Sequence, residues 1–234
     1  MADGSVIVTG ASRGIGAAIA ETLDARGVAV FGLSRSGTTP AGHAITCDMT
    51  DESAVQSVFA DIARQGSIAA LVNNAGVHIG GPTKELATEA YSEVMELNAT
   101  AVMVGCREVY PYFAKGGGSI VNIGSFWDRM GVANNLAYCA SKAAVGAITR
   151  CLAVEWAKDD IRVVDVAPGY IETDLNREHL ARDKVRTWLE SRVPVGRPGT
   201  PEEVARLVAA LLVEDIPFLT GETIYLDGGQ GINH

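Results

Sequence analysis

Ser5-Val6-Ile7-Val8-Thr9-Gly10-Ala11-Ser12-Arg13-Gly14-Ile15-Gly16 joins a β-rich run to a glycine-rich turn, and residues 17–26, rich in helix formers, follow. Glycines let the backbone turn tightly and approach a pyrophosphate, and a helix start offers unpaired N–H groups and a positive dipole end. The spacing is G-x-x-x-G-x-G, not the commonest dinucleotide fingerprint, G-x-G-x-x-G. The turn alone is compatible with a merely tight connection. Between a strand and a helix it predicts a nucleotide phosphate site made by Gly10, Ser12, Arg13, Gly14, Ile15 and Gly16.

The end of the second predicted strand, residues 28–33, bears on the choice of cofactor. An acidic residue there accepts a hydrogen bond from an adenosine ribose 2′-OH, whereas an arginine accommodates a 2′-phosphate. The strand runs into Ser34-Arg35 without an acid, and Arg13 in the glycine turn adds a second positive charge. We therefore expect NADP(H) in preference to NAD(H). The alternative is that Arg35 is a solvated loop residue.

The third predicted strand, residues 44–47, follows the short segment 36–42, which is rich in Gly, Thr and Pro. That segment is too short for a helix, so we expect the usual second crossover helix to be missing. Asp48 follows the strand and is expected to border the adenine ring, and Met49 beside it is a further candidate for cofactor binding. Alternatively, Asp48 is a turn residue before a helix over 51–65, which we expect Thr50 to cap.

The rest of the chain continues to alternate strands and helices. We predict strands over 69–72, 119–123, 161–167 and 223–226, and helices over 89–113, 138–158, 174–192 and 200–213. Thr200-Pro201-Glu202-Glu203 supplies an N-cap, a first-turn proline and a capping-box glutamate. Asn73-Asn74-Ala75-Gly76 suits the irregular backbone at the carboxyl end of a strand, where open α/β sheets bind ligands. Asn98 interrupts an apolar pattern and needs partners for its amide.

Tyr138 and Lys142 stand four residues apart in a predicted helix, which puts both on one face. A nearby ammonium favours the phenolate and lowers the tyrosine pKa, so the pair suits general acid/base catalysis. The plain alternative is a packed aromatic ring beside a solvated lysine. Ser125 ends the fifth predicted strand at the sheet edge of the Asn73 turn, and there its hydroxyl can donate a hydrogen bond to a substrate oxygen.

Bulk properties narrow the class of protein. The chain has 234 residues, 47% of them hydrophobic and 20% charged, as in an ordinary globular protein. A net charge of -9 argues against nucleic acid or an anionic membrane as partner. The four cysteines contain no C-x-x-C pair, which indicates reduced thiols and no zinc site. We expect a cytoplasmic protein without a signal peptide, and no metal site.

Several of these motifs, taken in order, resemble the short-chain dehydrogenase/reductase family over essentially the whole length. The matching segments are residues 9–16, Asn73 to Gly76, Asn98, Ser125, Tyr138 to Lys142, and Pro168-Gly169-Tyr170-Ile171-Glu172-Thr173. The resemblance implies one Rossmann-type α/β domain over residues 1–234, with a doubly wound, seven-stranded parallel sheet, helices on both faces, and assembly as a homotetramer.

The resemblance also implies roles for individual residues. Tyr138 would be the acid/base, and Ser125 would polarise the carbonyl. Lys142 would hold the nicotinamide ribose and lower the tyrosine pKa, and Asn98 would hold a relay water. Cofactor contacts would come from Asn74, Ala75, Gly76, Tyr138, Lys142, Pro168, Gly169, Ile171 and Thr173.

Two departures from the family pattern bear on function and scaffold. The ketoacyl reductase branch docks an acidic carrier protein with basic residues before the fifth and sixth strands. Here those regions read Lys115-Gly116-Gly117-Gly118-Ser119 and Lys158-Asp159-Asp160, so a carrier-protein partner is not expected. Val164 replaces an asparagine that many relatives have in the sixth strand.

The substrate end of the chain is the least informative part. Residues 171–195 sit where the family places its substrate lid. Candidates to face a substrate are His78, Trp127 and Trp188, with Ser125 as a polar contact and with Phe126 and Leu180 as further apolar candidates. For each apolar or aromatic candidate, packing is an equal alternative. Together they favour a pocket for an apolar or ring-shaped substrate.

We therefore expect an NADP(H)-preferring oxidoreductase acting on a small alcohol or ketone, cyclic or aromatic. A 3-oxoacyl-thioester reductase and an NAD-linked sugar or dihydrodiol dehydrogenase are the alternatives within that class. A non-catalytic dinucleotide sensor is the alternative from another class, and an isomerase or dehydratase a weaker one. A sensor would not need Ser125, Tyr138 and Lys142 together.

Overall fold

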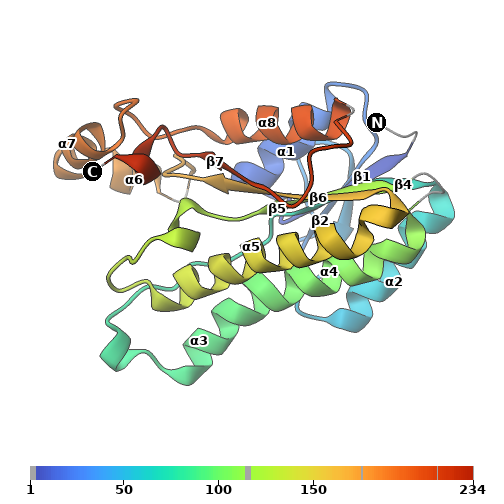
Figure 1. Cartoon of the computed structure of the whole chain (residues 1–234), viewed down its shortest axis with the longest axis horizontal. Helices are drawn as coiled ribbons and strands as arrows, with labels where there is room; N and C mark the ends of the chain where they lie inside the picture. Colours follow the sequence, from blue (N-terminus) through green and yellow to red (C-terminus); the bar gives the residue numbers. More distant parts are fainter. Residues whose placement is uncertain (1–3, 114–116, 175, 215, 234) are drawn as a thin grey trace.

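The computed structural model describes residues 4–113, 117–174, 176–214 and 216–233. Seven parallel strands form one sheet in the order β3-β2-β1-β4-β5-β6-β7 (Figure 1). Their bounds are β1 Ser5–Thr9, β2 Val30–Ser34, β3 His43–Thr46, β4 Ile68–Asn73, β5 Gly118–Ile123, β6 Ile161–Pro168 and β7 Thr223–Leu226. The predicted doubly wound sheet of seven strands is confirmed.

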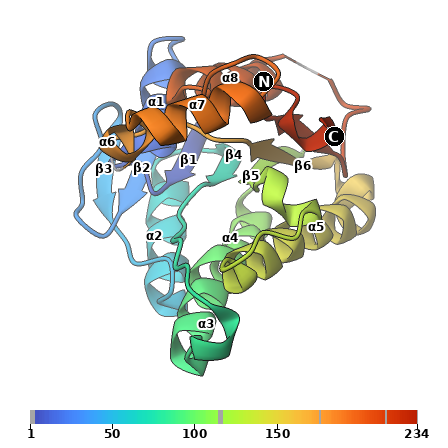
Figure 2. The ribbon, with the colours of Figure 1, turned by 90° about the vertical axis from the view of Figure 1, so that its left-hand side faces the viewer.

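Helices cover both faces of the sheet, as expected. Helices α1, Gly14–Asp24, and α8, Pro201–Val213, pack on one face, and α2, Glu52–Gln65, α4, Ala101–Val109, and α5, Leu136–Trp156, pack on the other (Figures 1 and 2). Each face encloses its own hydrophobic core; Phe59 and Leu71 lie in one and Ile19 and Leu212 in the other. Because both faces are covered, the central strands are apolar throughout instead of alternating.

The helix predicted over 89–113 is wrong in detail. Helix α3, Thr88–Met95, runs into a π-helical turn over Glu96–Thr100 before α4 begins, and a 3-10 turn over Tyr110–Tyr112 contains the proline that ends the run. Single π turns inserted into α-helices often occur at functional sites, and this one contains Asn98. The helix predicted over 174–192 is likewise two helices, α6 Arg177–Leu180 and α7 Asp183–Arg192.

The sequence predicts the N-cap of α8 correctly and the N-cap of α2 incorrectly. The capping box at Thr200 and Glu203 is confirmed. The cap predicted at Thr50 is wrong, because the Asp51 side chain accepts the hydrogen bond from the Ala54 N–H and the Thr50 hydroxyl donates to Asp48 instead. Helix α5 begins at Leu136, two residues before Tyr138.

Short turns connect the remaining elements. No helix lies between β2 and β3, as predicted. Further 3-10 turns span Thr83–Glu85, Phe126–Arg129, Ala157–Asp159 and Gln230–Ile232. Among the described residues no helix is long and apolar enough to cross a membrane. Lys115 and Gly116, and position 175 of the predicted lid, lie outside the described residues.

Candidate active site

The glycine turn after β1 has the conformation that its sequence predicts. Gly10 and Gly14 have φ of 68° and 58°, the left-handed region that L side chains avoid. Gly16 lies so close to the turn that an added Cβ would be 2.3 Å from the Gly10 carbonyl oxygen. The N-cap residue Arg13 makes no side-chain cap hydrogen bond to the described part of α1, which leaves the first N–H groups of the helix available to a ligand. These features fit a pyrophosphate.

Asn74 fixes the glycine turn from the neighbouring strand. Its Nδ2 donates to the Thr9 carbonyl at 2.9 Å and to the Gly10 carbonyl at 3.3 Å. The backbone N–H groups of Asn74 and Ala75 both donate to the Thr9 hydroxyl, at 2.9 and 3.0 Å. The segment after β4 is therefore tied to the turn after β1, at the point where the strand order reverses and open sheets bind ligands.

A cavity of about 710 Å³ runs along this edge of the sheet. Most of the predicted cofactor residues line it, namely Gly10, Ser12, Arg13, Gly14, Ile15, Ser34, Arg35, Asp48, Met49, Asn74, Ala75, Gly76 and Thr173. The other predicted cofactor residues are not in its lining: Gly16, Tyr138, Lys142, Pro168, Gly169 and Ile171. Gly16 packs under the turn, and Ile171 is buried beside Gly199.

Arg35 and Asp48 line the end of this cavity that is formed by the turns after β2 and β3. Arg35 is exposed at its rim. Hydrogen bonds from the Thr50 N–H and then the Thr50 hydroxyl hold the pKa of Asp48 below its usual range, and the Arg35 charge adds to this effect. Asp48 therefore has the geometry of a turn residue that also borders the cavity.

Ser125, Tyr138 and Lys142 come together beside the carboxyl end of β5. Lys142 is 6% exposed, and its Nζ donates to the Ile123 carbonyl at 2.7 Å and lies 5.7 Å from the centre of the Tyr138 ring. The Ser125 hydroxyl accepts from the Trp127 N–H at 3.3 Å and hydrogen-bonds the Tyr138 side chain. The alternative of a solvated lysine is thereby ruled out.

The expected effect of Lys142 on Tyr138 is wrong for this geometry. Burial raises the pKa of Tyr138, and the hydrogen bond from Ser125 only partly offsets that rise. Burial also lowers the pKa of Lys142, to about 8. Desolvation disfavours the charged form of both groups, and the distance between ammonium and ring leaves the attraction too weak to reverse it.

Asn98 is fully buried, and its amide is satisfied by protein groups. Its Oδ1 accepts from the Val77 N–H at 2.8 Å, and its Nδ2 donates to the Val77 carbonyl at 2.8 Å and to the Ser141 hydroxyl at 3.1 Å. Ser141 in turn donates to the Tyr138 carbonyl at 2.8 Å. Asn98 therefore joins the π turn, the loop after β4 and the Tyr138 turn of α5, and the predicted relay water stays a prediction.

Aromatic side chains surround the Tyr138 phenol. The His78 and Trp127 rings meet Tyr138 edge-on, with centroids 5.0 and 5.7 Å away. Trp127 also donates a hydrogen bond to the Tyr170 hydroxyl, and the Trp188 ring of α7 lies 5.5 Å from the Tyr170 ring. Three predicted substrate candidates, His78, Trp127 and Trp188, thus share one aromatic cluster.

The sequence reasoning missed two residues at this site. One is Tyr170, whose ring contacts the rings of Trp127 and Trp188. In the sequence it stands out only as an aromatic residue after Gly169. Asp165 is fully buried in β6 near Lys142, and its signal was a carboxylate inside an apolar strand. Phe126 and Leu180 belong to the packing alternative, because they are 2% and 8% exposed.

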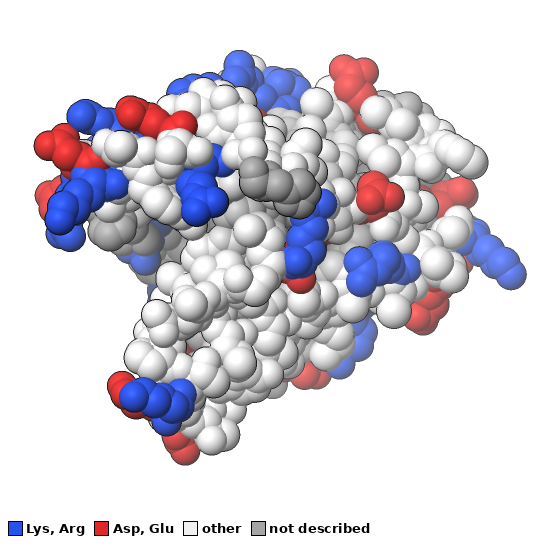
Figure 3. All heavy atoms as spheres, turned by 60° about the vertical axis from the view of Figure 1, so that its left-hand side comes forward, with Lys and Arg blue, Asp and Glu red and all other residues white. Residues whose placement is uncertain are grey.

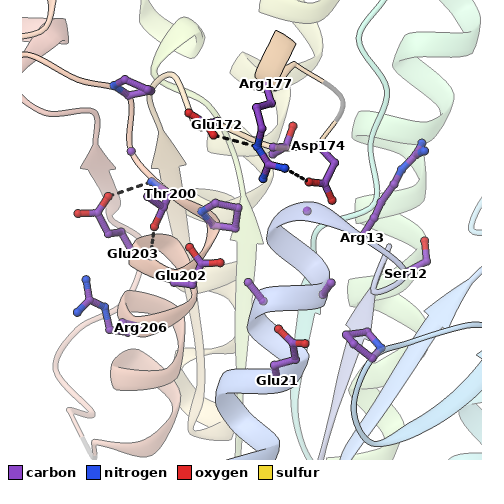
Figure 4. A pocket seen from close by; sticks show the side chains of 18 of the residues that line it. Ser12, Arg13, Glu21, Glu172, Asp174, Arg177, Thr200, Glu202, Glu203 and Arg206 are labelled. Carbon is purple, nitrogen blue, oxygen red and sulfur yellow. Dashed lines mark hydrogen bonds and ion pairs between the residues drawn. The ribbon is translucent and has the colours of Figure 1, made fainter. Parts of the chain in front are cut away.

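The predicted lid begins at the 710 Å³ cavity, whose lining includes Thr173 and Asp174. A second hollow, of about 790 Å³, lies between the starts of α1 and α8 and shares Ser12, Arg13, Gly14, Thr173 and Asp174 with that cavity (Figure 4). Arg177 pairs with Glu172 at 3.1 Å and Asp174 at 2.9 Å across the lid's first turn. A surface notch separates the predicted lid from the part of the protein that carries α3. It is bordered mainly by uncharged residues (Figure 3).

Comparisons with known proteins agree with this geometry. Residues 10–230 match the family model described as Enoyl-(Acyl carrier protein) reductase. The chain is 37% identical to the 3-oxoacyl-acyl-carrier-protein reductase of Vibrio cholerae, over 96% of each chain. It is 34% identical to 3beta-hydroxysteroid dehydrogenase 1 of Eggerthella lenta, over 97% of this chain and 93% of that protein.

A solved structure extends the comparison to three dimensions. The aldohexose dehydrogenase of Thermoplasma acidophilum, in ligand-free form, superposes with a TM-score of 0.91 at 33% identity, covering 99% of this chain and 95% of that chain. Sequence, fold and the order of the motifs agree. The chain therefore belongs to the short-chain dehydrogenase/reductase family and is an NAD(P)-dependent oxidoreductase that acts on CH–OH groups.

Proposed function

We propose that this protein is an NADP(H)-preferring oxidoreductase that interconverts a small, uncharged, ring-shaped alcohol and its ketone. The observation that carries the proposal is the meeting of Ser125, Tyr138 and Lys142 at the carboxyl end of β5, the sheet edge along which the 710 Å³ cavity also runs. Tyr138 exchanges a proton with the substrate oxygen, Ser125 donates a hydrogen bond to that oxygen, and Lys142 supplies positive charge. The dinucleotide supplies or accepts the hydride when bound.

The test of this mechanism is the variant Tyr138→Phe. It removes the phenolic hydroxyl and leaves the aromatic contacts with His78 and Trp127. We expect turnover to fall by several orders of magnitude while the dinucleotide still binds. Near-normal turnover would refute the mechanism. Dinucleotide-dependent binding of a protein partner, with no turnover by the wild type on any carbonyl compound, would favour the sensor.

The preference for NADP(H) is supported by Arg35 and Arg13, which both line the cavity and are exposed. A 2′-phosphate is a dianion that such side chains accommodate. In Arg35→Ala we expect the dissociation constant for NADPH to rise by about tenfold or more, the loss of a charge-assisted contact, and that for NADH to change little. Equal effects on both would show that Arg35 does not distinguish them.

The substrate class is supported by the aromatic cluster of His78, Trp127, Tyr138, Tyr170 and Trp188. Flat aromatic walls favour ring-shaped ligands by contact over a wide area. The hydroxysteroid and aldohexose dehydrogenases named above act on cyclic compounds, which agrees with this proposal. The related carrier-protein reductase favours the thioester alternative, but the net charge of -9 and the Asp159-Asp160 pair before β6 argue against an acidic carrier.

One assay separates these substrate classes. Initial rates of NADPH oxidation, with NADH beside it, are measured on an acetoacetyl thioester, on cyclic ketones and on oxidised sugars. Faster turnover of cyclic ketones supports the proposal. Fast turnover of the thioester would identify a 3-oxoacyl-thioester reductase.

The proposed function also includes a substrate lid, an oligomeric state and a location in the cell. Residues 171–195 act as the lid, and a homotetramer forms in the cytoplasm, partly through α8 and β7 and partly through the long helices α4 and α5. Exposed apolar residues on these helices, including Met103 and Val154, support the interface. Sedimentation velocity of the purified chain would test the oligomeric state.

A further inference from the structure

Asp165 is a charged residue that is fully buried inside the fold. It lies in the middle of β6, opposite Asn122 of β5 and Thr223 of β7, and is 0% exposed. Its strand neighbours Val164 and Val166 are buried as well. Burying a carboxylate costs several kcal/mol unless an opposite charge or hydrogen bonds compensate it. The opposite charge and the hydrogen bonds that compensate Asp165 therefore indicate its role.

The hydrogen bonds of Asp165 are incomplete. Oδ2 accepts from the Thr223 hydroxyl at 3.2 Å, whereas Oδ1 has no partner with hydrogen-bond geometry among the described residues. The nearby Gly124 N–H donates to the Val166 carbonyl at 2.8 Å instead, and it only slightly offsets the effect of burial on the Asp165 pKa. Oδ1 faces Gly124, where an added Cβ would lie only 2.5 Å away. Gly124 directly follows Ile123, whose carbonyl accepts from Lys142 Nζ. Carboxylate and ammonium thus approach the same two residues, one from β6 and one from α5.

The charges around Asp165 make Lys142 its principal partner. Burial raises the pKa of Asp165 to about 6, and the Lys142 charge opposes that rise. Asp165 in turn opposes the fall that burial imposes on the pKa of Lys142. Asp128 is the other charge facing Asp165 and repels it. Asp128 is itself held by the Tyr225 hydroxyl at 2.8 Å, and Arg129 stacks on the Tyr225 ring.

We propose that Asp165 is a positioning residue for the proposed reaction, a buried counter-charge that keeps the Lys142 side chain protonated and directed to the carboxyl end of β5. The inference rests on the proposed function, because Lys142 matters to turnover only if Tyr138 exchanges a proton with the substrate. Asp165 touches neither that proton nor the substrate. It acts through Lys142 alone.

The variant Asp165→Asn removes the charge and keeps the shape. Without its counter-charge, Lys142 should titrate about 1 pH unit lower. Carbonyl reduction leaves a phenolate at Tyr138 in the proposed reaction, and the charged lysine stabilises that anion, so the rate should fall about fivefold at pH 8 and less than twofold at pH 6. A merely structural loss would lower the rate equally at both pH values. Asp61→Asn, which removes an exposed carboxylate of α2, should leave the profile unchanged.

A second readout needs no turnover. The chain has only five lysines, so their ¹³Cε signals can be followed by NMR against pH, and the Lys142→Arg variant identifies the one of interest. In Asp165→Asn the Lys142 midpoint should move to lower pH by about 1 unit. An unchanged midpoint together with an unchanged pH profile would overturn the proposal.

The proposal can still be tested if Asp165→Asn does not fold or if the wild type turns over no substrate. If Asp165→Asn does not fold, Thr223→Val removes the hydroxyl that stabilises the carboxylate, and it should shift the Lys142 midpoint in the same direction by less. An unchanged midpoint in that variant would then overturn the proposal. If the wild type turns over no substrate, the proposed function fails, but the NMR midpoints still decide whether Asp165 supports Lys142.

Discussion

Gly16 offers a quantitative test of the glycine turn. In Gly16→Ala the new methyl group would lie 2.3 Å from the Gly10 carbonyl oxygen and 2.4 Å from Asn74 Nδ2. Neither atom is the end of a flexible chain, since one is backbone and the other is fixed by its bonds to Thr9 and Gly10. Overpacking of this kind costs about 1–3 kcal/mol.

Two further terms set the expected magnitude. Moving Asn74 aside weakens two hydrogen bonds, each contributing about 1 kcal/mol. Alanine in place of a helical glycine returns about 1 kcal/mol. We therefore expect the free energy of unfolding to fall by about 3 kcal/mol, with overpacking and lost hydrogen bonds outweighing helix propensity. The displaced turn should also weaken NADPH binding by about tenfold or more.

The assay is denaturant unfolding together with a fluorescence titration of NADPH. Gly66→Ala is the matched control, because nothing lies within 4 Å of the position that its new methyl group would take and its backbone is extended, with φ of 163°. If Gly16→Ala unfolds within about 0.5 kcal/mol of the wild type and binds NADPH equally well, the close packing of the turn is not what the site depends on.

Three more substitutions each test a small set of contacts. Glu203→Gln should cost about 1 kcal/mol at pH 7, because it weakens the capping box and the pair with Arg197. The folded-state pKa of Glu203 is lowered to about 2, so this stability is present above pH 4.5 and lost as pH falls towards 2; urea unfolding at pH 7 and 3 should show the difference shrink. Asn98→Leu leaves both backbone groups of Val77 unpaired and should cost about 2 kcal/mol or more in thermal or urea unfolding. Trp127→Ala should raise KM for a cyclic ketone more than for a small acyclic one, and unchanged kinetics on both would remove Trp127 from the pocket.

The fold was predictable because its signals are local. Alternating apolar strands and amphipathic helices, the glycine turn after β1 and the capping box at Thr200 each specify a short segment. The π turn at Asn98 was not predictable in this way. The apolar pattern continues through it, and the turn coincides with an amide whose partners lie 21 residues away at Val77. Sequence periodicity carries no information about that pairing.

The choice between Thr50 and Asp51 as helix cap shows a similar limit. Both side chains cap helices well, and they are adjacent in the sequence. What excludes Thr50 is its hydroxyl, which is already bonded to Asp48 at 2.8 Å. The lining of the cavity at the sheet edge, by contrast, was largely predictable, because strand ends of a parallel sheet meet at one edge wherever the helices between them begin and end.

Asp165 was visible in the sequence but not interpretable there. A carboxylate in the run from Ile161 to Ala167 signals a buried charge, since the flanking residues are apolar. The sequence could not supply its partners, because Lys142 comes from helix α5 and Thr223 from strand β7, 58 residues further on. The residue type indicates a buried charge that needs partners, and only the fold identifies those partners.

The Tyr138 pKa shows that helical spacing can place two side chains near each other and still predict the wrong direction of a pKa shift. Spacing alone counts the attraction of Lys142 for a phenolate and omits the burial of both groups. In the structure burial dominates and raises the tyrosine pKa. The protein alone therefore holds the phenol protonated, which is the form that carbonyl reduction needs. Alcohol oxidation needs the phenolate, and so requires additional positive charge, which an oxidised nicotinamide would bring.

Ionisation of Tyr138 should therefore depend on the cofactor. In a tyrosinate absorbance titration, the difference between wild type and Tyr138→Phe should show no ionisation below about pH 9 in the protein alone, since burial raises the pKa above the ordinary value of 10.0. With saturating NADP⁺ the difference signal should move to lower pH by about 1 unit or more, as expected for a cation nearby. With NADPH it should not. A Tyr138 signal that titrates below about pH 8 without cofactor would mean that Lys142 outweighs burial after all, because the hydrogen bond from Ser125 alone does not offset burial.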